Sequence, residues 1–286
     1  MTVTSSRTPE AVSIVRRDIR FEVDGHDVRT WHPDGLHVAH FFNALSLFFP
    51  EGERFFIESV RQFRDRVRSP RLRADVEAFI GQEATHGREH RRYNVALAEA
   101  GLPAQELETG LRDELAKLRK LITPEDALAI TIALEHFTAI MAHELLGDDR
   151  ILAGTDPALA AIWRWHAIEE TEHKAVAFDV YRETVGESGA AYRRRVRTML
   201  ATTLTFWMQV FRYHFHLVRA DGAAMDLRGW WKLVRFLWIN PGGMPRLIRA
   251  WLAYFRRDFH PWQRDDYGYV ERWKATYAGA ASARPA

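Results

Sequence analysis

The sequence contains no cysteine, which excludes disulfide bonds, thiolate metal sites and a cysteine nucleophile. Any bound metal must therefore be held by histidine, aspartate or glutamate. Glycine and proline are sparse, with 17 and 11 among 286 residues, which favours helices over turn-rich β-structure. The N-terminus lacks the apolar core of a signal peptide, so we expect a cytoplasmic protein. The longest uncharged apolar run, residues 198–211, is too short to span a bilayer.

Acidic residues are scarce in one part of the chain. Residues 191–260 contain 13 Lys or Arg and 3 Asp or Glu, a net charge of +10. The remainder has 27 basic and 35 acidic residues, a net charge of −8. The chain therefore has an acidic part and a basic part, and the carboxylate motifs described below lie in the acidic part.

Apolar periodicity predicts four long helices, at about residues 50–68, 70–100, 124–146 and 157–186. Three of them begin with a capping residue followed by proline, a strong start signal, at Ser69-Pro70, Thr123-Pro124 and Asp156-Pro157. No stretch shows strand-like alternation. The fold class is therefore all-α, and we expect a ferritin-like four-helix bundle with additional C-terminal amphipathic helices.

Composition divides the chain into four segments. Residues 1–30 form a polar N-terminal arm without a helical pattern, and residues 31–190 contain the helical bundle. Residues 191–265 are basic and rich in aromatic side chains, and we expect their helices to pack on the bundle. Residues 266–286 form a C-terminal tail.

Two Glu-x-x-His steps carry the chemistry, Glu83 to His86 and Glu170 to His173. Residues three apart share a face of a helix, so each step directs a carboxylate and an imidazole to one point. Two such helices, with one glutamate from each of two others, make the dinuclear carboxylate site of a ferritin-like bundle. A single step of this kind is common as a solvated pair, so the remaining two glutamates decide the interpretation.

Glu53 and Glu135 supply those two glutamates at matching heights. In the first hairpin, Glu53 and Glu83 lie 16 and 14 residues from the connecting turn. In the second, Glu135 and Glu170 lie 11 and 13 residues from the helix ends at the connection. At the rise of an α-helix these mismatches are only about 3 Å. Both hairpins therefore place their carboxylates at mid-height.

The six side chains also continue the apolar stripes of their helices, so they point inward. Ionised groups are almost never left bare in a core, and no inward Lys or Arg is patterned to meet these. A pair of metal ions satisfies them. We predict that one metal is bound by Glu53, Glu83 and His86, and the other by Glu135, Glu170 and His173, with Glu83 and Glu170 bridging. Glu58 falls on the polar face of its helix and is interpreted as a surface residue.

Several neighbouring side chains have more than one interpretation. Glu169 and Glu172 are either solvated or support the ligands from behind. His90, His136 and His166 are candidates for supporting the ligands or relaying protons, or they are ordinary hydrogen-bonded interior histidines. We identify no catalytic residue beyond the metal ligands and no site for an organic cofactor.

These motifs together resemble a bacterial family catalogued as predicted metal-dependent hydrolases. The resemblance rests on the segments Phe49–Phe56, Gln82–His86, Ala133–His136 and Trp165–His173, and on Tyr254–Trp262 near the C-terminus. It extends over roughly residues 30–265. It implies a ferritin-like fold with a di-metal site.

A site of four glutamates and two histidines suits two iron ions, with manganese or zinc as alternatives. Our first hypothesis is an O₂-dependent di-iron oxidase or oxygenase that acts on an apolar or acyl small molecule and uses an unidentified electron donor. The second is a two-metal hydrolase that uses a metal-bound hydroxide. The third is a non-enzymatic metal-binding or storage protein.

The basic C-terminal region combines tryptophan with arginine on amphipathic helices, a composition typical of membrane-surface helices. Packing on the bundle, a homodimer face and peripheral membrane contact are all consistent with it. We do not expect nucleic-acid binding, because no recognised module is present.

Overall fold

The computed structural model describes residues 8–9 and 12–281, and this part of the chain contains helices and no strands. The helices of the first half are α1 (Leu36–Ser46), α2 (Phe49–Arg61), η1 (Arg64–Arg66), α3 (Pro70–Glu99), α4 (Ala104–Arg119) and α5 (Pro124–Gly147). Those of the second half are η2 (Asp149–Leu152), α6 (Pro157–His173), α7 (Val176–Thr184), α8 (Gly189–Ala220), α9 (Leu227–Trp238), α10 (Gly243–Ala253), η3 (Pro261–Gln263) and α11 (Tyr267–Ala281). The predicted all-α class is confirmed.

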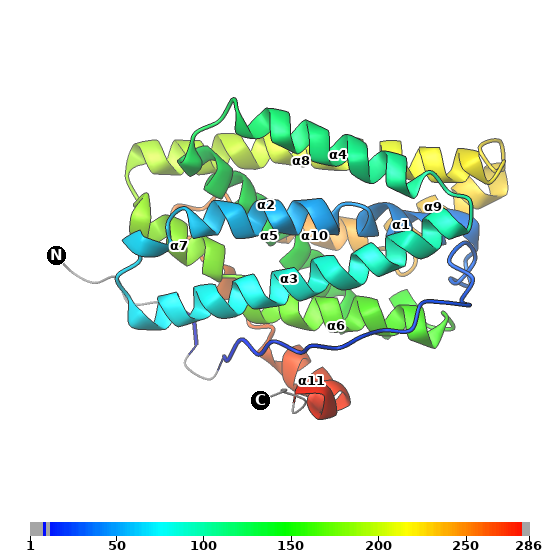
Figure 1. Ribbon diagram of the computed structural model, residues 1–286, viewed down its shortest axis with the longest axis horizontal. Coiled ribbons are helices and arrows are strands. Elements are labelled where there is room, and N and C mark those ends of the chain that lie inside the picture. The colour runs from blue at the N-terminus through cyan, green and yellow to red at the C-terminus, as the bar shows by residue number, and fades with distance from the viewer. Residues whose placement is uncertain (1–7, 10–11, 282–286) are drawn as a thin grey trace.

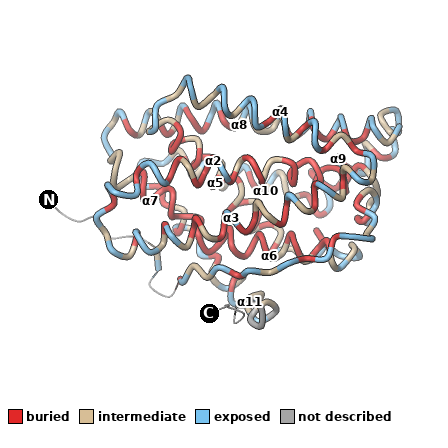
Figure 2. Tube along the Cα trace, in the orientation of Figure 1, coloured by how far each residue is buried: buried red, intermediate tan, exposed pale blue. Residues whose placement is uncertain are grey.

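Four of these helices form the central bundle (Figure 1). Helix α2 packs on α3, α5 packs on α6, and the two pairs meet through contacts of α2 with α5 and of α3 with α6. Buried residues concentrate along these helices, whereas α4 and α8 have many exposed residues along their outer edge (Figure 2). The four carry the predicted ligands, so the fold brings the motifs into one core.

The three predicted helix starts form as expected. Ser69 Oγ accepts a hydrogen bond from the Leu72 amide at 3.3 Å, and Thr123 Oγ1 accepts one from the Asp126 amide at 3.1 Å. The Asp156 carboxylate caps the first turn of α6 in the same way. Each cap satisfies an amide that the first turn would otherwise leave unpaired, and proline at the next position costs no hydrogen bond.

The prediction of one continuous helix over residues 157–186 was wrong, because α6 ends at His173 and α7 begins at Val176. Neither glycine nor proline marks the break. The buried Lys174 at the break places its Nζ 2.6 Å from Asp266 Oδ2 and 2.8 Å from the Arg264 carbonyl oxygen. The break thus coincides with a buried lysine whose partners lie about ninety residues away in the sequence, a pairing that local sequence does not reveal. The first helix is also shorter than predicted, since α2 ends at Arg61.

Helix α5 is long and apolar enough to cross a membrane by length and composition alone. Its apolar window is 67% buried inside the bundle, however, and it carries Glu135 in its middle. These features are those of the core helix of a globular bundle. The apolar composition of α5 therefore reflects its central position.

Residues 12–30 form no helix and run along α3 and α6 (Figure 1), with Phe21, Val23 and Val28 buried. On the side of α1 and α5, helices α8, α9 and α10 add an outer layer. Helix α11 packs on α6 and lies within the segment that composition identified as a tail. Residues 1–7 of the predicted arm and 282–286 of the predicted tail lie outside the described residues. The division into four segments stays a prediction.

Candidate metal centre

The six predicted ligands meet in the middle of the bundle. Helix α2 contributes Glu53, α3 contributes Glu83 and His86, α5 contributes Glu135, and α6 contributes Glu170 and His173. Each is at most 2% exposed. Together with His166 they form two groups in which one potential ligand atom per residue lies within 4.8 Å of the others: Glu53, His86, His166 and Glu170 in the first group, and Glu83, Glu135 and His173 in the second.

These groups differ from the predicted division of the ligands. His173 Nε2 lies 3.0 Å from Glu83 Oε1 and 3.7 Å from Glu135 Oε2, so Glu83 belongs with His173 and not with His86. Glu170 faces both groups, with Oε1 3.7 Å from His86 Nδ1 and Oε2 3.5 Å from His173 Nε2. One oxygen toward each group is what a bridging carboxylate requires. The assignment of ligands to individual metals stays a prediction.

The centre contains buried polar atoms that lack well-formed hydrogen bonds in the described part of the chain. Nine buried polar atoms of the six side chains make no well-formed hydrogen bond among the described residues, although two of them, His173 Nε2 and Glu83 Oε1, lie 3.0 Å apart. They are both carboxylate oxygens of Glu53, Glu83 and Glu135, Oε2 of Glu170, Nδ1 of His86 and Nε2 of His173. In the same part of the chain, no Lys or Arg forms an ion pair with the four carboxylates. Unpaired buried carboxylates are costly, and such groups normally coordinate metals. The residues therefore fit a pair of metal ions.

The electrostatics of the centre agree with this interpretation. Burial, and then the negative charges of Glu83 and Glu170, hold the pKa of Glu53 well above its ordinary range. Burial likewise raises the pKa of Glu135 strongly and that of Glu83 to about 7. At Glu170 burial acts in the same direction, but the neighbouring His173 and a hydrogen bond from His166 outweigh it and hold the pKa well below normal. Metal binding to such a centre must displace protons from the raised carboxyls.

The second nitrogen of each ligand histidine is held from behind. His86 Nε2 lies 3.1 Å from Glu169 Oε2, and His173 Nδ1 lies 2.8 Å from Gln82 Oε1. Gln82 in turn donates to Glu172 Oε2 at 2.9 Å. Partners of this kind fix the orientation of a ligand imidazole and raise its basicity. The unpaired nitrogen of each ring consequently faces the centre.

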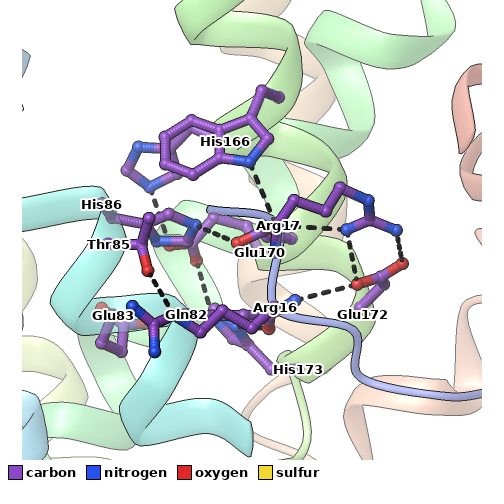
Figure 3. A network of polar contacts seen from close by, with 12 residues as sticks. Arg16, Arg17, Gln82, Glu83, Thr85, His86, His166, Glu170, Glu172 and His173 are labelled. Atoms are coloured by element: carbon purple, nitrogen blue, oxygen red, sulfur yellow. Dashed lines mark hydrogen bonds and ion pairs between the residues drawn. The ribbon is translucent and has the colours of Figure 1, made fainter. Parts of the chain in front are cut away.

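Arg17 joins these two supporting chains (Figure 3). Its Nη1 donates to Glu169 Oε1 at 3.2 Å and its Nη2 to Glu172 Oε1 at 2.7 Å, and its side chain is 3% exposed. Glu169 and Glu172 are themselves buried, so they are not solvated and instead support the ligands from behind. The role of Arg17 is not predictable from the sequence, because this residue lies in a segment without periodicity.

His166 belongs to the centre itself. Its Nε2 lies 2.8 Å from Glu170 Oε1 and 3.7 Å from Glu53 Oε1. Its Nδ1 lies 2.7 Å from His90 Nε2, and His90 Nδ1 lies 2.9 Å from Ser46 Oγ. His166 is therefore placed as a further potential ligand, and His90 as its hydrogen-bond partner. Its position one turn before Glu170 was the only sequence signal.

Two other residues lie away from the centre. His136 Nε2 lies 3.0 Å from the Ala250 carbonyl oxygen, and its ring packs on Tyr254 and Phe259. His136 is therefore a hydrogen-bonded interior histidine. Glu58 is 39% exposed and pairs with Arg119, in agreement with the surface position predicted for it.

Two largely apolar cavities reach the centre. One, of about 110 Å³, ends at His166 and Glu170 and is walled by α1, α5, α9 and α10. The other, of about 520 Å³, ends at Glu53 and lies between α2, α4, α5 and α8. Four residues line both cavities: Leu45, Phe49, Thr138 and Met141. The centre is therefore accessible to an apolar molecule.

Comparison with known proteins gives one family. A family model described as "predicted metal-dependent hydrolase" matches residues 15–265. Neither the curated proteins nor the solved structures contain a significant match.

Proposed function

The chain belongs to the family of predicted metal-dependent hydrolases, and from that premise we propose that it is a dinuclear metal enzyme that uses iron and O₂ to oxidise an apolar or acyl small molecule. The observation that carries this proposal is the convergence of nine unpaired, buried ligand atoms at the end of two apolar cavities. Carboxylate and imidazole ligands without thiolate suit iron or manganese.

The residues of this chain would hold the metals and shape their surroundings. Glu53, Glu83, His86, Glu135, Glu170 and His173 would be the ligands, with His166 as a further candidate. A bound pair of iron ions would supply the activation of O₂ as an oxidant of the substrate. His166 and His90, 2.7 Å apart, can move a proton between the centre and Ser46.

The walls of the cavities favour oxidation of carbon over hydrolysis. Thr138 is the polar side chain that lines both cavities, and its hydroxyl already donates to the Glu135 carbonyl oxygen at 3.0 Å. The donors that line only the larger cavity lie on α8, which carries none of the ligands: Arg197, Thr198, Thr202, Thr205 and Gln209. A scissile ester or phosphate would need donors for its developing negative charge. An apolar chain needs only shape and the exclusion of water.

Hydrolysis remains the second candidate, because the family description names it. The His166–His90 pair could also protonate a leaving group. In this alternative the two metal ions would polarise the scissile group.

Metal analysis with anaerobic Fe(II) loading and an O₂ pulse tests the proposal. We expect two iron ions per chain and a change in the optical spectrum after O₂. Tightly bound zinc, with no spectral change after a ferrous-loaded sample meets O₂, would contradict the oxidase proposal and favour the hydrolase. Glu53→Gln should lose metal, whereas Glu58→Gln, on the same helix but at the surface, should not.

A further inference from the structure

The exposed large apolar side chains are concentrated in one part of the chain. Among the described residues there are 15 of them, and 13 lie between residues 200 and 252, on α8, α9, α10 and their connections. The other two are Val95 and Leu121. Contiguous exposed apolar surface of this kind marks an interaction site in soluble proteins.

On α8 these side chains follow the helical period and form one stripe: Leu200, Leu204, Met208, Phe211 and Phe215. At the rise of an α-helix the stripe is about 22 Å long. The inward face of α8 carries a separate buried set that includes Met199, Tyr213 and Leu217. The exposed stripe is therefore additional to the residues that pack α8 on the bundle.

Helices α9 and α10, which neighbour α8, carry further exposed apolar side chains. Helix α9 exposes Trp231 and Trp238, which are 60% and 52% exposed, and α10 exposes Ile248 and Leu252. Helix α10 contacts α9, and the Trp251 indole N–H donates to Thr203 Oγ1 on α8 at 2.9 Å. We call the exposed apolar residues of α8, α9 and α10 the apolar face.

Unpaired basic side chains accompany the apolar face. Five exposed basic residues of α8, α9 and α10 form no ion pair with any described residue: Arg193, Arg219, Arg228, Lys232 and Arg249. The three acids of residues 191–260 do not neutralise this region, since Asp221 pairs with Arg29, which lies outside it, and the net charge is +10. A twofold dimer through this face would place two such basic surfaces against each other. An anionic lipid surface satisfies both the charges and the apolar side chains.

We propose that the apolar face docks this protein on an anionic membrane, from which the apolar substrate enters the centre. The entry step rests on the proposed function, whereas the docking does not. Helix α8 walls the larger cavity with Thr198, Ala201 and Thr205, and the other cavity is walled by Phe236 of α9 and Leu247 of α10. A molecule that leaves the lipid beside these helices would meet the cavities directly.

Flotation of the full, metal-loaded chain with vesicles tests the docking. We expect the protein to float with vesicles of phosphatidylcholine mixed with phosphatidylglycerol, and to float far less with phosphatidylcholine alone. Trp231→Ser combined with Trp238→Ser should weaken binding at least about tenfold through lost apolar burial. Arg228→Gln combined with Lys232→Gln should weaken it about thirtyfold, at about fivefold per charge.

Matched control variants test whether a loss of vesicle binding is specific to the apolar face. Leu121→Ser removes an exposed leucine elsewhere, and Lys117→Gln with Lys120→Gln removes two exposed charges at the C-terminal end of α4, so neither should change flotation. Absence of binding to the anionic vesicles would overturn the inference, as would equal binding to both vesicle types. A stable dimer that the Trp231 and Trp238 changes dissociate would overturn it in favour of a second copy.

Metal content distinguishes the failure of docking from the failure of the proposed function. The face variants should keep their metal, whereas Glu53→Gln should lose metal and still float. Flotation without bound metal in the unchanged protein would refute the enzyme proposal and leave the docking standing.

Discussion

Replacing Arg17 by methionine should both destabilise the protein and weaken its metal centre. Arg17 touches neither group of potential ligands, but it holds Glu169 and Glu172 in place behind them. Methionine fills a similar volume without charge or donors. The change therefore isolates the support that the N-terminal arm gives to the centre.

The magnitude follows from the two carboxylates that would lose their cation. Removal of one partner from a buried ion pair costs about 3–5 kcal/mol. A carboxylate can limit this loss by taking a proton, at about 3 kcal/mol for a glutamate at pH 7. Burial raises the pKa of Glu169 to about 8 even beside Arg17, so once Arg17 is removed this residue can take a proton near neutral pH at little cost. Most of the loss then comes from Glu172, and we expect the free energy of unfolding to fall by about 3 kcal/mol.

Chemical denaturation and metal titration measure the two effects. We expect metal affinity to fall about 10–100-fold, because His86 and His173 lose the fixed partners behind their rings. Arg20→Met, an exposed change in the same arm, should leave both quantities unaltered. Adding Glu172→Gln to Arg17→Met should restore most of the lost stability. A variant Arg17→Met within about 0.5 kcal/mol of the parent, as for an ordinary surface change, would refute the reasoning.

Four further predictions concern the centre and its cavities. Glu135→Gln should remove most bound metal in elemental analysis yet stabilise the metal-free protein by about 1–2 kcal/mol in denaturation, because an unpaired buried carboxylate disappears. His166→Asn should lower metal affinity about tenfold in titration, whereas His136→Asn should not change it. Met141→Trp should reduce binding of a fluorescent fatty-acid probe about tenfold without loss of metal, because it narrows both cavities. Burial raises the pKa of Glu83 from 4.5 to about 7. In thermal melts of the metal-free protein, the contribution of this group to stability should therefore be complete below pH 4.5 and lost as the pH rises through 7. Metal affinity should rise over the same pH range.

The parts of this structure that local sequence encodes were predictable. The start of α3 follows from a serine cap and a proline, and its ligands follow from a three-residue step on an apolar stripe. The same signals located α5 and α6. Matching heights then placed Glu53 and Glu135 beside the two steps, and the structure brings all six side chains together.

The parts that depend on tertiary partners were not predictable. Arg17 has no periodic neighbour, and only the path of the arm along α3 and α6 brings it to Glu169. The grouping of Glu83 with His173 depends on side-chain orientations across the bundle, which spacing along one helix does not determine. The break after His173 likewise has no glycine or proline to mark it, and the buried Lys174 at the break pairs with the distant Asp266.

Burial disfavours ionised carboxylates, whereas metal binding requires them. Without metal, the histidines offset the charge of Glu170, while the raised pKa values of Glu53, Glu83 and Glu135 favour bound protons at the atoms that would face the ions. Metal binding exchanges these protons for cations and leaves the surrounding apolar packing unchanged. The depth of burial therefore sets both how readily the protons leave and how strongly the ions are held. Because α8 and α10 wall the cavities that reach the centre and also carry part of the apolar face, insertion into lipid should further exclude water from the cavities and strengthen the electrostatic interactions of the centre.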